Sequence, residues 1–200
     1  MNIAVFVSGN GSNLQAIIDS VKNGKLKCGI ALVVSDKKDA YALKRAKKAG
    51  IQTFVLDKKG FNTREDYDKS LINQLERKNV DLVVLAGFMR LLSPYFVEKY
   101  KNRIMNIHPA LLPSFKGTHG IEDAFNFGVK ITGVTVHFVD EKLDNGPIIL
   151  QEQVLIGKND TLDSLEERIH QVEHRLYPQA IKLYQEGKVT VKGRRVIIKD

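Results

Sequence analysis

Apolar runs and helical patterns alternate through the first half of the chain. Helical spacing is clearest in residues 64–78, where Tyr67, Leu71 and Leu75 recur at every fourth position after Asn62 and Thr63, which suit a helix N-cap. Continuous apolar strands that alternate with helices are typical of a parallel sheet covered on both faces. The first half therefore predicts a doubly wound, mostly parallel α/β sheet. Its strands are predicted at 2–8, 29–35, 52–57, 81–87 and 103–108, and its helices from Leu14, at 38–48, at 64–78 and at 93–100.

The pattern changes after residue 108, where residues 109–120 are loop-like. Pro178 is expected to kink the last long helix and Gly187 to end it. The elements predicted in this half are a short helix at 121–128, two antiparallel strands at 133–139 and 147–154, a long helix from Thr161 to about Gln185, and a hairpin at 188–198. We expect one domain, 1–200, with halves 1–100 and 101–200.

The composition is that of an ordinary globular chain with a basic balance. Of 200 residues, 43% are hydrophobic and 27% charged, both usual for a soluble domain, and the net charge is +8. The Lys and Arg residues are spread along the chain without an RNA-binding or helix-turn-helix pattern, so most are expected on solvated helix faces. We expect anionic small molecules as partners, no nucleic acid and, since no apolar run is long enough to span a bilayer, no membrane.

Two features favour the cytoplasm. Cys28 is the single cysteine, so no intrachain disulfide can form, and its apolar surroundings predict a buried, inert thiol. The N-terminal sequence MNIAVFVSGNG has no basic region and leads directly into a strand, which is unlike a secretion signal.

A glycine-rich loop, SGNGSN at 8–13, follows the first strand and opens the first helix. Backbone N–H groups at a helix N-terminus attract anions, and glycine lets them approach closely. The loop matches neither the ATP-type phosphate motif nor the dinucleotide fingerprint, because Leu14 stands where the third glycine of the fingerprint would be. A plain strand-to-helix turn and a monophosphate cradle both remain open.

Asn106 and His108 lie two positions apart at the end of the fifth strand and therefore share a face. Ligands of doubly wound sheets bind at the carboxyl ends of the strands, and an amide donor beside an imidazole suits a developing oxyanion. A carboxylate should orient the imidazole, and the turn DEKLDNG offers Asp140, Glu141 and Asp144 without a physical reason to choose. A covalent nucleophile is not evident, which favours direct transfer to an external nucleophile.

The remaining histidines carry weaker signals. His119 is expected on a surface loop and His137 as a half-buried strand residue with its hydrogen bonds satisfied. The segment HQVEH at 170–174 fits a zinc pattern, but a catalytic zinc wants a third protein ligand and the only later glutamate is Glu186. We therefore expect no metal.

Four segments resemble the folate-dependent formyltransferases, and among them the phosphoribosylglycinamide formyltransferases of purine synthesis. They are VSGNGSNLQAI (7–17), AGFMRLL (86–92), NIHPALLPSF (106–115) and GVTVHFVDEKLDNGPII (133–149). Methionyl-tRNA formyltransferases add a C-terminal domain, for which we expect no room, and formyltetrahydrofolate deformylases usually add an N-terminal one, whereas the first strand here begins at Asn2.

The resemblance implies a formyltransferase fold, with ribonucleotide phosphate binding in residues 1–100 and folate binding and catalysis in 101–200. It implies Asn106, His108 and Asp144 as the catalytic set, which selects one of the three carboxylates. It further implies that Gly11, Ser12 and Asn13 hold the ribose-phosphate, that Glu173 binds the ribose hydroxyls, and that the formyl-folate is held by Arg64, Met89, Arg90, Leu91, Leu92, Asn106, Asp140 and Asp144. Two positions depart from the pattern: Lys116 stands where proline is expected, and His170 where a more basic residue is common.

The implied reaction is formyl transfer from 10-formyltetrahydrofolate, a co-substrate, to the amine of glycinamide ribonucleotide. Asn106 and a cationic His108 paired with Asp144 would stabilise the tetrahedral intermediate. Two alternatives stay open: hydrolysis of the same formyl-folate, and an RNA-binding module that uses the basic surface. A homodimer is compatible with the sequence.

Overall fold

The computed structural model describes residues 1–199, whose contacts separate into two compact units, Met1–Met105 and Asn106 onward. The boundary falls inside the strand β5 (Ile104–His108). The first unit contains β1 (Asn2–Val7), α1 (Ser12–Lys22), β2 (Gly29–Ser35), α2 (Tyr41–Lys48), β3 (Thr53–Val55), α3 (Arg64–Arg77), β4 (Leu82–Leu85) and α4 (Pro94–Lys99).

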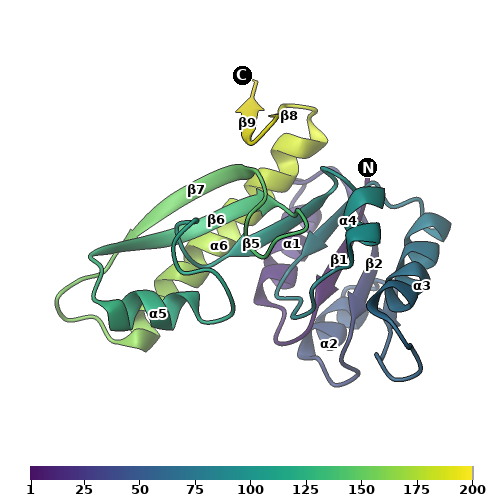
Figure 1. Ribbon diagram of the computed structural model, residues 1–200, viewed down its shortest axis with the longest axis horizontal. Helices are drawn as coiled ribbons and strands as arrows, with labels where there is room; N and C mark the ends of the chain where they lie inside the picture. The colour runs from purple at the N-terminus through teal and green to yellow at the C-terminus, as the bar shows by residue number, and fades with distance from the viewer. Residues whose placement is uncertain (200) are drawn as a thin grey trace. The chain divides into compact units, whose positions relative to one another are not determined.

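The strands of the first unit are parallel and lie in the order β3-β2-β1-β4. α1 contacts α2 and α3 contacts α4, and the two pairs lie on opposite faces of the strands (Figure 1). Right-handed crossovers require this arrangement, because the chain moves outward from β1 to β3 and then returns to β4 on the other side of β1. The loops after β1 and β4 therefore leave neighbouring strand ends, at a topological switch point.

Local sequence explains where these helices begin. The Thr63 hydroxyl accepts the Asp66 N–H at the start of α3, and the Ser93 hydroxyl accepts the Phe96 N–H at the start of α4, with Pro94 in the first position. The predictions for these two helices are confirmed. α1 begins at Ser12 rather than Leu14, because Gly11 adopts a left-handed conformation and turns the chain two residues earlier.

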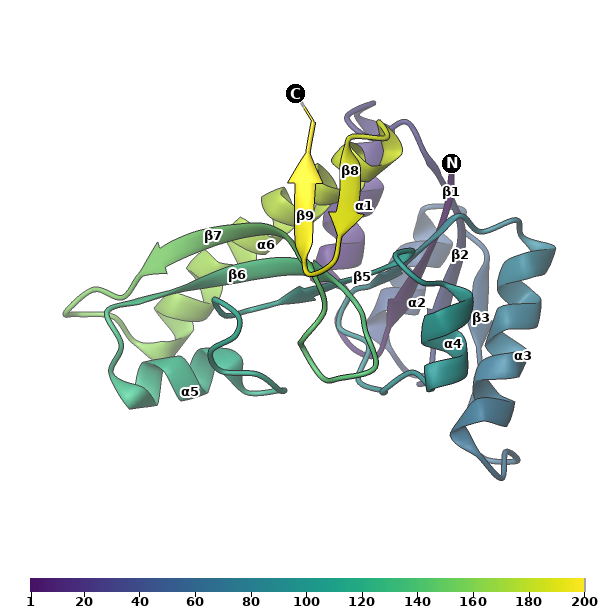
Figure 2. The same ribbon diagram turned by 45° about the horizontal axis from the view of Figure 1, so that its top comes forward.

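The second unit contains α5 (Gly120–Phe127), β6 (Ile131–Phe138), β7 (Ile148–Leu155), α6 (Leu162–Gln185), β8 (Val189–Lys192) and β9 (Arg195–Ile198). β6 and β7 pair antiparallel, as do β8 and β9, and β7 pairs with β9 in parallel. α6 packs against β6 and β7, and the β8–β9 hairpin follows it (Figure 2). The predicted α/β class, with parallel strands first and antiparallel pairs toward the C-terminus, is confirmed.

Some boundaries differ from the prediction. β3 has three residues instead of the six of 52–57, and it pairs with β2 alone, so half of its backbone groups lack a strand partner. α6 begins at a capping box of Thr161 and Ser164 and continues through Pro178 to Gln185. The predicted kink at Pro178 is not accompanied by a break in the helix.

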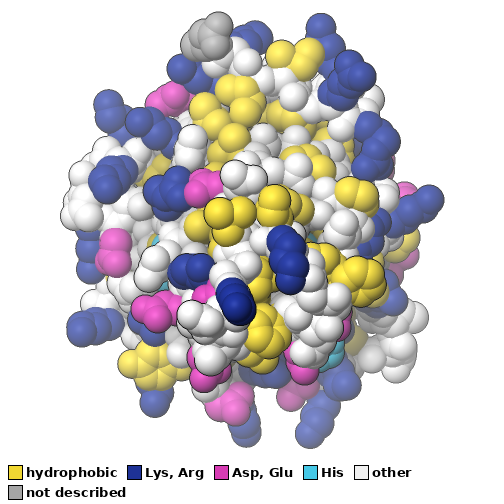
Figure 3. Space-filling view, turned by 90° about the vertical axis from the view of Figure 1, so that its left-hand side faces the viewer, with side chains coloured by type: hydrophobic (Ala, Val, Ile, Leu, Met, Phe, Trp, Pro, Cys, Tyr) yellow, Lys and Arg dark blue, Asp and Glu magenta, His cyan; other side chains and the backbone are white. Residues whose placement is uncertain are grey.

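Exposed apolar side chains gather at the end of the second unit where α5 ends, β6 begins and β7 ends (Figure 3). They include Phe127, Ile131 and Leu155. On the same face, Lys and Arg side chains are scattered rather than gathered in one stripe (Figure 3). Among residues 1–199, none of the helices combines the length and the apolar character that crossing a bilayer requires.

Candidate active site

Three polar side chains of the second unit meet at the end of β5. Asp144 Oδ2 lies 3.5 Å from His108 Nδ1, and Asp144 Oδ1 lies 3.4 Å from Asn106 Nδ2. Asn106 and His108 reach the same carboxylate because they project from one face of the strand, as their spacing predicts. His108 and Asp144 are buried, with 3% and 8% of their surface exposed.

Both ring nitrogens of His108 face acceptors. Nε2 is 2.7 Å from the Phe115 carbonyl oxygen, a distance that requires Nε2 to donate its proton, and Nδ1 faces the Asp144 carboxylate. When the ring carries both protons, each nitrogen therefore has an oxygen in front of it. Phe115 and Asp144 both have positive φ, 49° and 45°, which is uncommon outside glycine and is found where structure imposes it at functional sites.

The carboxylate of Asp144 is held in its charged form. Burial raises its pKa, but the neighbouring His137 ring, the Gly117 N–H that donates to Oδ2 over 2.9 Å, and the charge of His108 outweigh burial and leave the pKa below its usual value. A buried anion beside an imidazole is the electrostatic arrangement that an acid catalyst needs.

His137 belongs to this cluster, and the sequence did not indicate it. It is buried rather than half-buried, and its Nδ1 donates to the Phe138 carbonyl oxygen over 2.7 Å. Its Nε2 lies 3.2 Å from Asn106 Nδ2 and 3.7 Å from Asp144 Oδ1, so the ring contacts both the amide and the carboxylate. This contact orients the Asn106 amide with its N–H groups toward the cluster.

The turn after β6 selects Asp144 from the three acidic candidates. Asp140 is used within the turn, where its oxygens accept from the Lys142 N–H and the Asn145 amide, and Glu141 is exposed. Lys116, the residue in place of the expected proline, reaches toward the same turn, with Nζ 3.4 Å from Asn145 Oδ1. The structure thus brings Asp144 to His108 and leaves Asp140 outside the cluster.

The chain after His108 is fixed by buried hydrogen bonds. The Thr135 hydroxyl donates to the Ala110 carbonyl oxygen and accepts the Leu112 N–H, and the Gln151 amide donates to the Leu112 carbonyl oxygen. A Cβ on Gly120 would lie 3.3 Å from His108 Nε2, so the absence of a side chain there leaves room for the imidazole. His119, as predicted, is exposed.

The glycine-rich loop of the first unit is braced by α2. Gly11 has φ +77°, and a Cβ there would lie 2.5 Å from Ala42 Cβ, so both the backbone and the packing require glycine. The Arg45 guanidinium donates to the carbonyl and side-chain oxygens of Asn10. Ser12 and Asn13 occupy the first turn of α1, where N–H groups and the helix dipole favour an anion.

The segment 86–92 that follows β4 presents apolar side chains to solvent. Met89 and Leu91 are 61% and 56% exposed, whereas Leu92 is buried, so only its backbone could contact a ligand. The Arg90 guanidinium packs 4.3 Å above the Tyr67 ring. Arg64 is exposed at the start of α3, close enough to Asp68 for an electrostatic interaction. Exposed apolar side chains on a hydrogen-bonded backbone suit the binding of an apolar part of a ligand.

Glu173 is buried on α6 and bonded to His170. Nδ1 of His170 lies 2.9 Å from Glu173 Oε2, and this contact, opposed by burial, raises the pKa of His170. His170 also stacks on His174, with ring centroids 6.3 Å apart. In residues 1–199, groups of three or more His, Cys, Asp or Glu arranged to hold a metal ion are absent, and HQVEH forms an ion pair and a ring stack instead.

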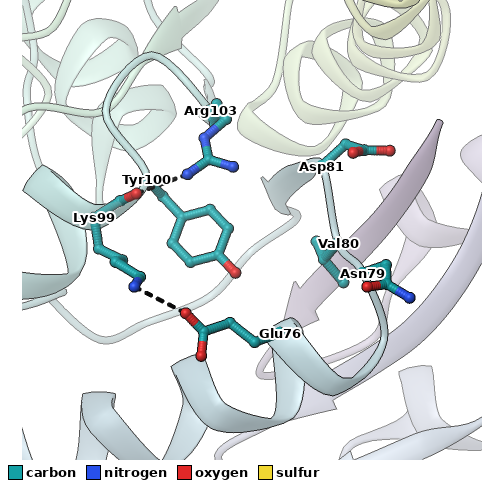
Figure 4. Close-up of a pocket in the computed structure, with 7 residues that line it drawn as sticks. All are labelled: Glu76, Asn79, Val80, Asp81, Lys99, Tyr100 and Arg103. Carbon is teal, nitrogen blue, oxygen red and sulfur yellow. Dashed lines mark hydrogen bonds and ion pairs between the residues drawn. The ribbon is translucent and has the colours of Figure 1, made fainter.

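A depression of about 300 Å³ lies at the opposite end of β4, beside α3 and α4 (Figure 4). Its charges are paired within it: Lys99 Nζ is 2.9 Å from Glu76 Oε1, and Arg103 donates to the Lys99 carbonyl oxygen and packs on Tyr100. It opens at the amino ends of the strands, whereas parallel sheets bind ligands at the carboxyl ends. We assign it no ligand.

Known proteins similar to this chain include bacterial enzymes that match it over most of their length and trifunctional purine biosynthetic proteins that match it over 14–19% of theirs. Residues 1–181 match a family described as formyl transferase. The chain is 47% identical over 189 residues to the phosphoribosylglycinamide formyltransferase of Escherichia coli K12, and the match covers 94% of this chain and 89% of that protein.

Solved structures give the same result. Glycinamide ribonucleotide transformylase 1 from Symbiobacterium toebii superposes with a TM-score of 0.97 at 45% identity, over 100% of this chain and 94% of that one. A formyltetrahydrofolate deformylase from Pseudomonas syringae superposes with a TM-score of 0.92 at 26% identity, over 100% of this chain and 66% of the other. Similarity is thus closer to the transferases than to the hydrolase.

Proposed function

The chain belongs to the formyl transferase family, and from this premise we propose that it transfers the formyl group of 10-formyltetrahydrofolate to the amine of 5'-phosphoribosylglycinamide, a step of de novo purine biosynthesis. The observation that carries the proposal is the cluster at the end of β5, in which half-buried Asn106 lies beside buried His108 and Asp144. It supplies an amide donor, an imidazolium and a carboxylate within one small volume, which suits acyl transfer.

The reaction needs little help in making the nucleophile. The substrate amine resembles an α-amino group with a pKa of about 8, so on the order of a tenth of it is neutral at pH 7. The demanding step is the negative charge that develops on the formyl oxygen when the amine attacks the formyl carbon. Side chains that donate hydrogen bonds in a buried site stabilise this charge more strongly than water does.

Each member of the cluster then has one task. Asn106 donates an N–H to the oxyanion. His108, held as a cation by Asp144, stabilises the same charge and acts as general acid. Its Nε2 proton is bound to Phe115, whereas the 3.5 Å between Nδ1 and Asp144 exceeds an ordinary hydrogen bond, so Nδ1 is the nitrogen that we assign to the acid step.

The reaction exchanges one bond of the formyl carbon for another. A bond forms between the substrate amine and the formyl carbon, and the bond from that carbon to the folate nitrogen breaks. The proton lost by the amine reaches the folate nitrogen through His108 and a relaying water, so the enzyme returns to its starting protonation state.

The binding roles follow the sequence prediction. We propose that Gly11, Ser12 and Asn13 hold the phosphate and Glu173 the ribose hydroxyls. The formyl-folate is proposed to contact Arg64, Met89, Arg90, Leu91, the backbone of Leu92, Asp140 and the catalytic residues Asn106 and Asp144. The support is the helix N-terminus behind the glycine loop and the exposed apolar side chains of 86–92.

Hydrolysis of 10-formyltetrahydrofolate is the second candidate, and the similarity to a deformylase at 26% identity favours retaining it. One assay separates the two functions. The protein is incubated with 10-formyltetrahydrofolate with and without glycinamide ribonucleotide, and tetrahydrofolate, formate and formylated ribonucleotide are measured. We expect formylated product in stoichiometric yield and no turnover without the ribonucleotide. Formate release at the same rate with and without the ribonucleotide would identify a hydrolase.

Three further features stay proposals. We propose that residues 1–200 act as one catalytic domain, that the protein works in the cytoplasm, where a single buried Cys28 suits the reducing conditions, and that the chain can form a homodimer. Sedimentation equilibrium of the full chain measures the last of these directly.

A further inference from the structure

Ser8, the first residue after β1, is buried and bonded to two other segments. Its N–H donates to the Gly87 carbonyl oxygen over 3.0 Å. Its hydroxyl accepts the Met89 N–H over 2.9 Å and donates to Asp36 Oδ1 over 2.6 Å. One hydroxyl therefore links the loops that follow three strands: Ser8 follows β1, Asp36 follows β2, and Met89 follows β4.

These three loops meet at the carboxyl ends of adjacent strands, since β1 lies between β2 and β4. This is the switch point at which doubly wound sheets bind ligands. The glycine loop 8–13 begins at Ser8, and the exposed apolar side chains of 86–92 begin at Met89. Ser8 thus stands between two elements to which the proposed function gives different ligands.

We propose that Ser8 is a positioning residue that fixes the segment 86–92 against the glycine loop and so sets the affinity for the folate co-substrate. The inference rests on the proposed function and assigns to Ser8 no contact with substrate. It extends to Asp36, whose carboxylate orients the hydroxyl so that its lone pairs face the Met89 N–H.

The anchoring of 86–92 explains why one hydroxyl matters. Past Met89 the segment is held by Arg90 on the Tyr67 ring, and at its end the Ser93 N–H donates to buried Asp68 over 2.6 Å. The side chains on either side of Arg90, Met89 and Leu91, are mostly exposed and receive little packing of their own. Their direction therefore depends on the backbone, which Ser8 holds at its start.

The charge on Asp36 strengthens the arrangement. An O–H to carboxylate bond of 2.6 Å is in the range of charge-assisted hydrogen bonds, which are about twice as strong as neutral ones. A hydroxyl whose proton is committed to a carboxylate offers its lone pairs to the Met89 N–H without rotating away. Asp36→Ala should loosen this geometry, whereas Asp36→Asn keeps an acceptor in the same place.

The test compares Ser8→Ala with Ser35→Ala. Ser35 is a matched control, because its hydroxyl is also buried at the end of a neighbouring strand. It donates to the Lys37 carbonyl oxygen and accepts the Lys37 N–H, so both of these bonds lie within its own turn. Affinity for 10-formyltetrahydrofolate alone is measured by calorimetry, and KM and kcat by the transfer assay. Amide hydrogen exchange of residues 86–92 reports the position of the segment independently of activity.

For Ser8→Ala we expect about a tenfold loss of folate affinity, the equivalent of one hydrogen bond, a smaller change in the KM for the ribonucleotide, and kcat within about threefold. Hydrogen exchange at Met89 should accelerate by at least the same factor. Asp36→Ala should show a weaker form of both effects, and Asp36→Asn, which keeps the acceptor but loses the charge, a still smaller one. Ser35→Ala should show neither effect.

If amide hydrogen exchange at Met89 is the same in Ser8→Ala as in the wild type, the positioning role is overturned, even where the variant loses folate affinity or turnover. Faster exchange with unchanged folate affinity, or equal losses in Ser8→Ala and Ser35→Ala, would overturn the link to folate. If the wild-type protein does not bind 10-formyltetrahydrofolate, the proposed function is overturned, and so is the effect of Ser8 on folate affinity. Hydrogen exchange at Met89 would still show whether Ser8 positions the segment 86–92.

Discussion

The two units present their polar groups in opposite ways. In the second unit, Asn106, His108, His137 and Asp144 bury their charges and amides and satisfy one another. In the first unit, the glycine loop and the segment 86–92 present backbone groups and exposed side chains. Packing of Gly11 against Ala42 and the hydrogen bond from the Met89 N–H to Ser8 hold these two segments in place. Buried, mutually oriented groups suit chemistry, because their charges are preorganised, whereas exposed backbone suits binding. Changes in the cluster of Asn106, His108 and Asp144 should lower kcat, and changes in the glycine loop or the segment 86–92 should raise KM.

The largest effect is expected for Asp144→Asn, which keeps the shape of the side chain but removes the charge beside His108. We expect kcat to fall by ~10²-fold or more, the usual loss when transition-state charge stabilisation is removed, with the KM for the ribonucleotide near the wild-type value. The control is Glu141→Gln, which removes an exposed carboxylate from the same turn. Steady-state kinetics measure both. Equal losses in the two variants would contradict a specific role for Asp144.

A smaller effect, on binding, is expected for Gly11→Ala. The added Cβ meets Ala42, and a left-handed φ costs an L-residue about 1 kcal/mol, so the loop should shift and the KM for the ribonucleotide should rise about tenfold. Gly9→Ala is the matched control in the same loop, because a Cβ there would have nothing within 4 Å. A fall in kcat without a change in KM would place the loop with the chemistry instead.

The smallest effect is on stability and comes from the His170–Glu173 pair. The contact raises the pKa of His170 above 6.5, so its contribution is complete below pH 6.5 and is lost as the pH rises through the folded pKa. Since His170 is about half exposed, we expect about 0.5 kcal/mol or less. Urea unfolding of His170→Gln and wild type across this range measures the difference. If the difference in the free energy of unfolding between wild type and His170→Gln increases as the pH rises, the stabilising role of the His170–Glu173 pair is contradicted.

Most of the fold was accessible from the sequence, because helix caps and buried strands are local signals. Asn62 and Thr63 predicted the start of α3, and the spacing of Tyr67, Leu71 and Leu75 predicted its buried face. β3 was overestimated, since the extent of pairing depends on a neighbouring strand rather than on apolar content.

The candidate site was accessible only in part. Strand periodicity joined Asn106 to His108, but choosing Asp144 over Asp140 needed a resemblance to known enzymes, because only the folded turn shows which carboxylate points inward. His137 was missed for a physical reason. β6 is buried on both faces from Thr132 to Phe138, so alternation carries no information about which of its residues face the cluster.

The most direct test of the account is formyl transfer by Asn106→Ala and His108→Ala at saturating concentrations of both substrates, with thermal unfolding to check that each variant folds. We expect each variant to lose turnover by ~10²–10³-fold, because each loses a group that stabilises the developing charge. Turnover near the wild-type rate in both variants would contradict it.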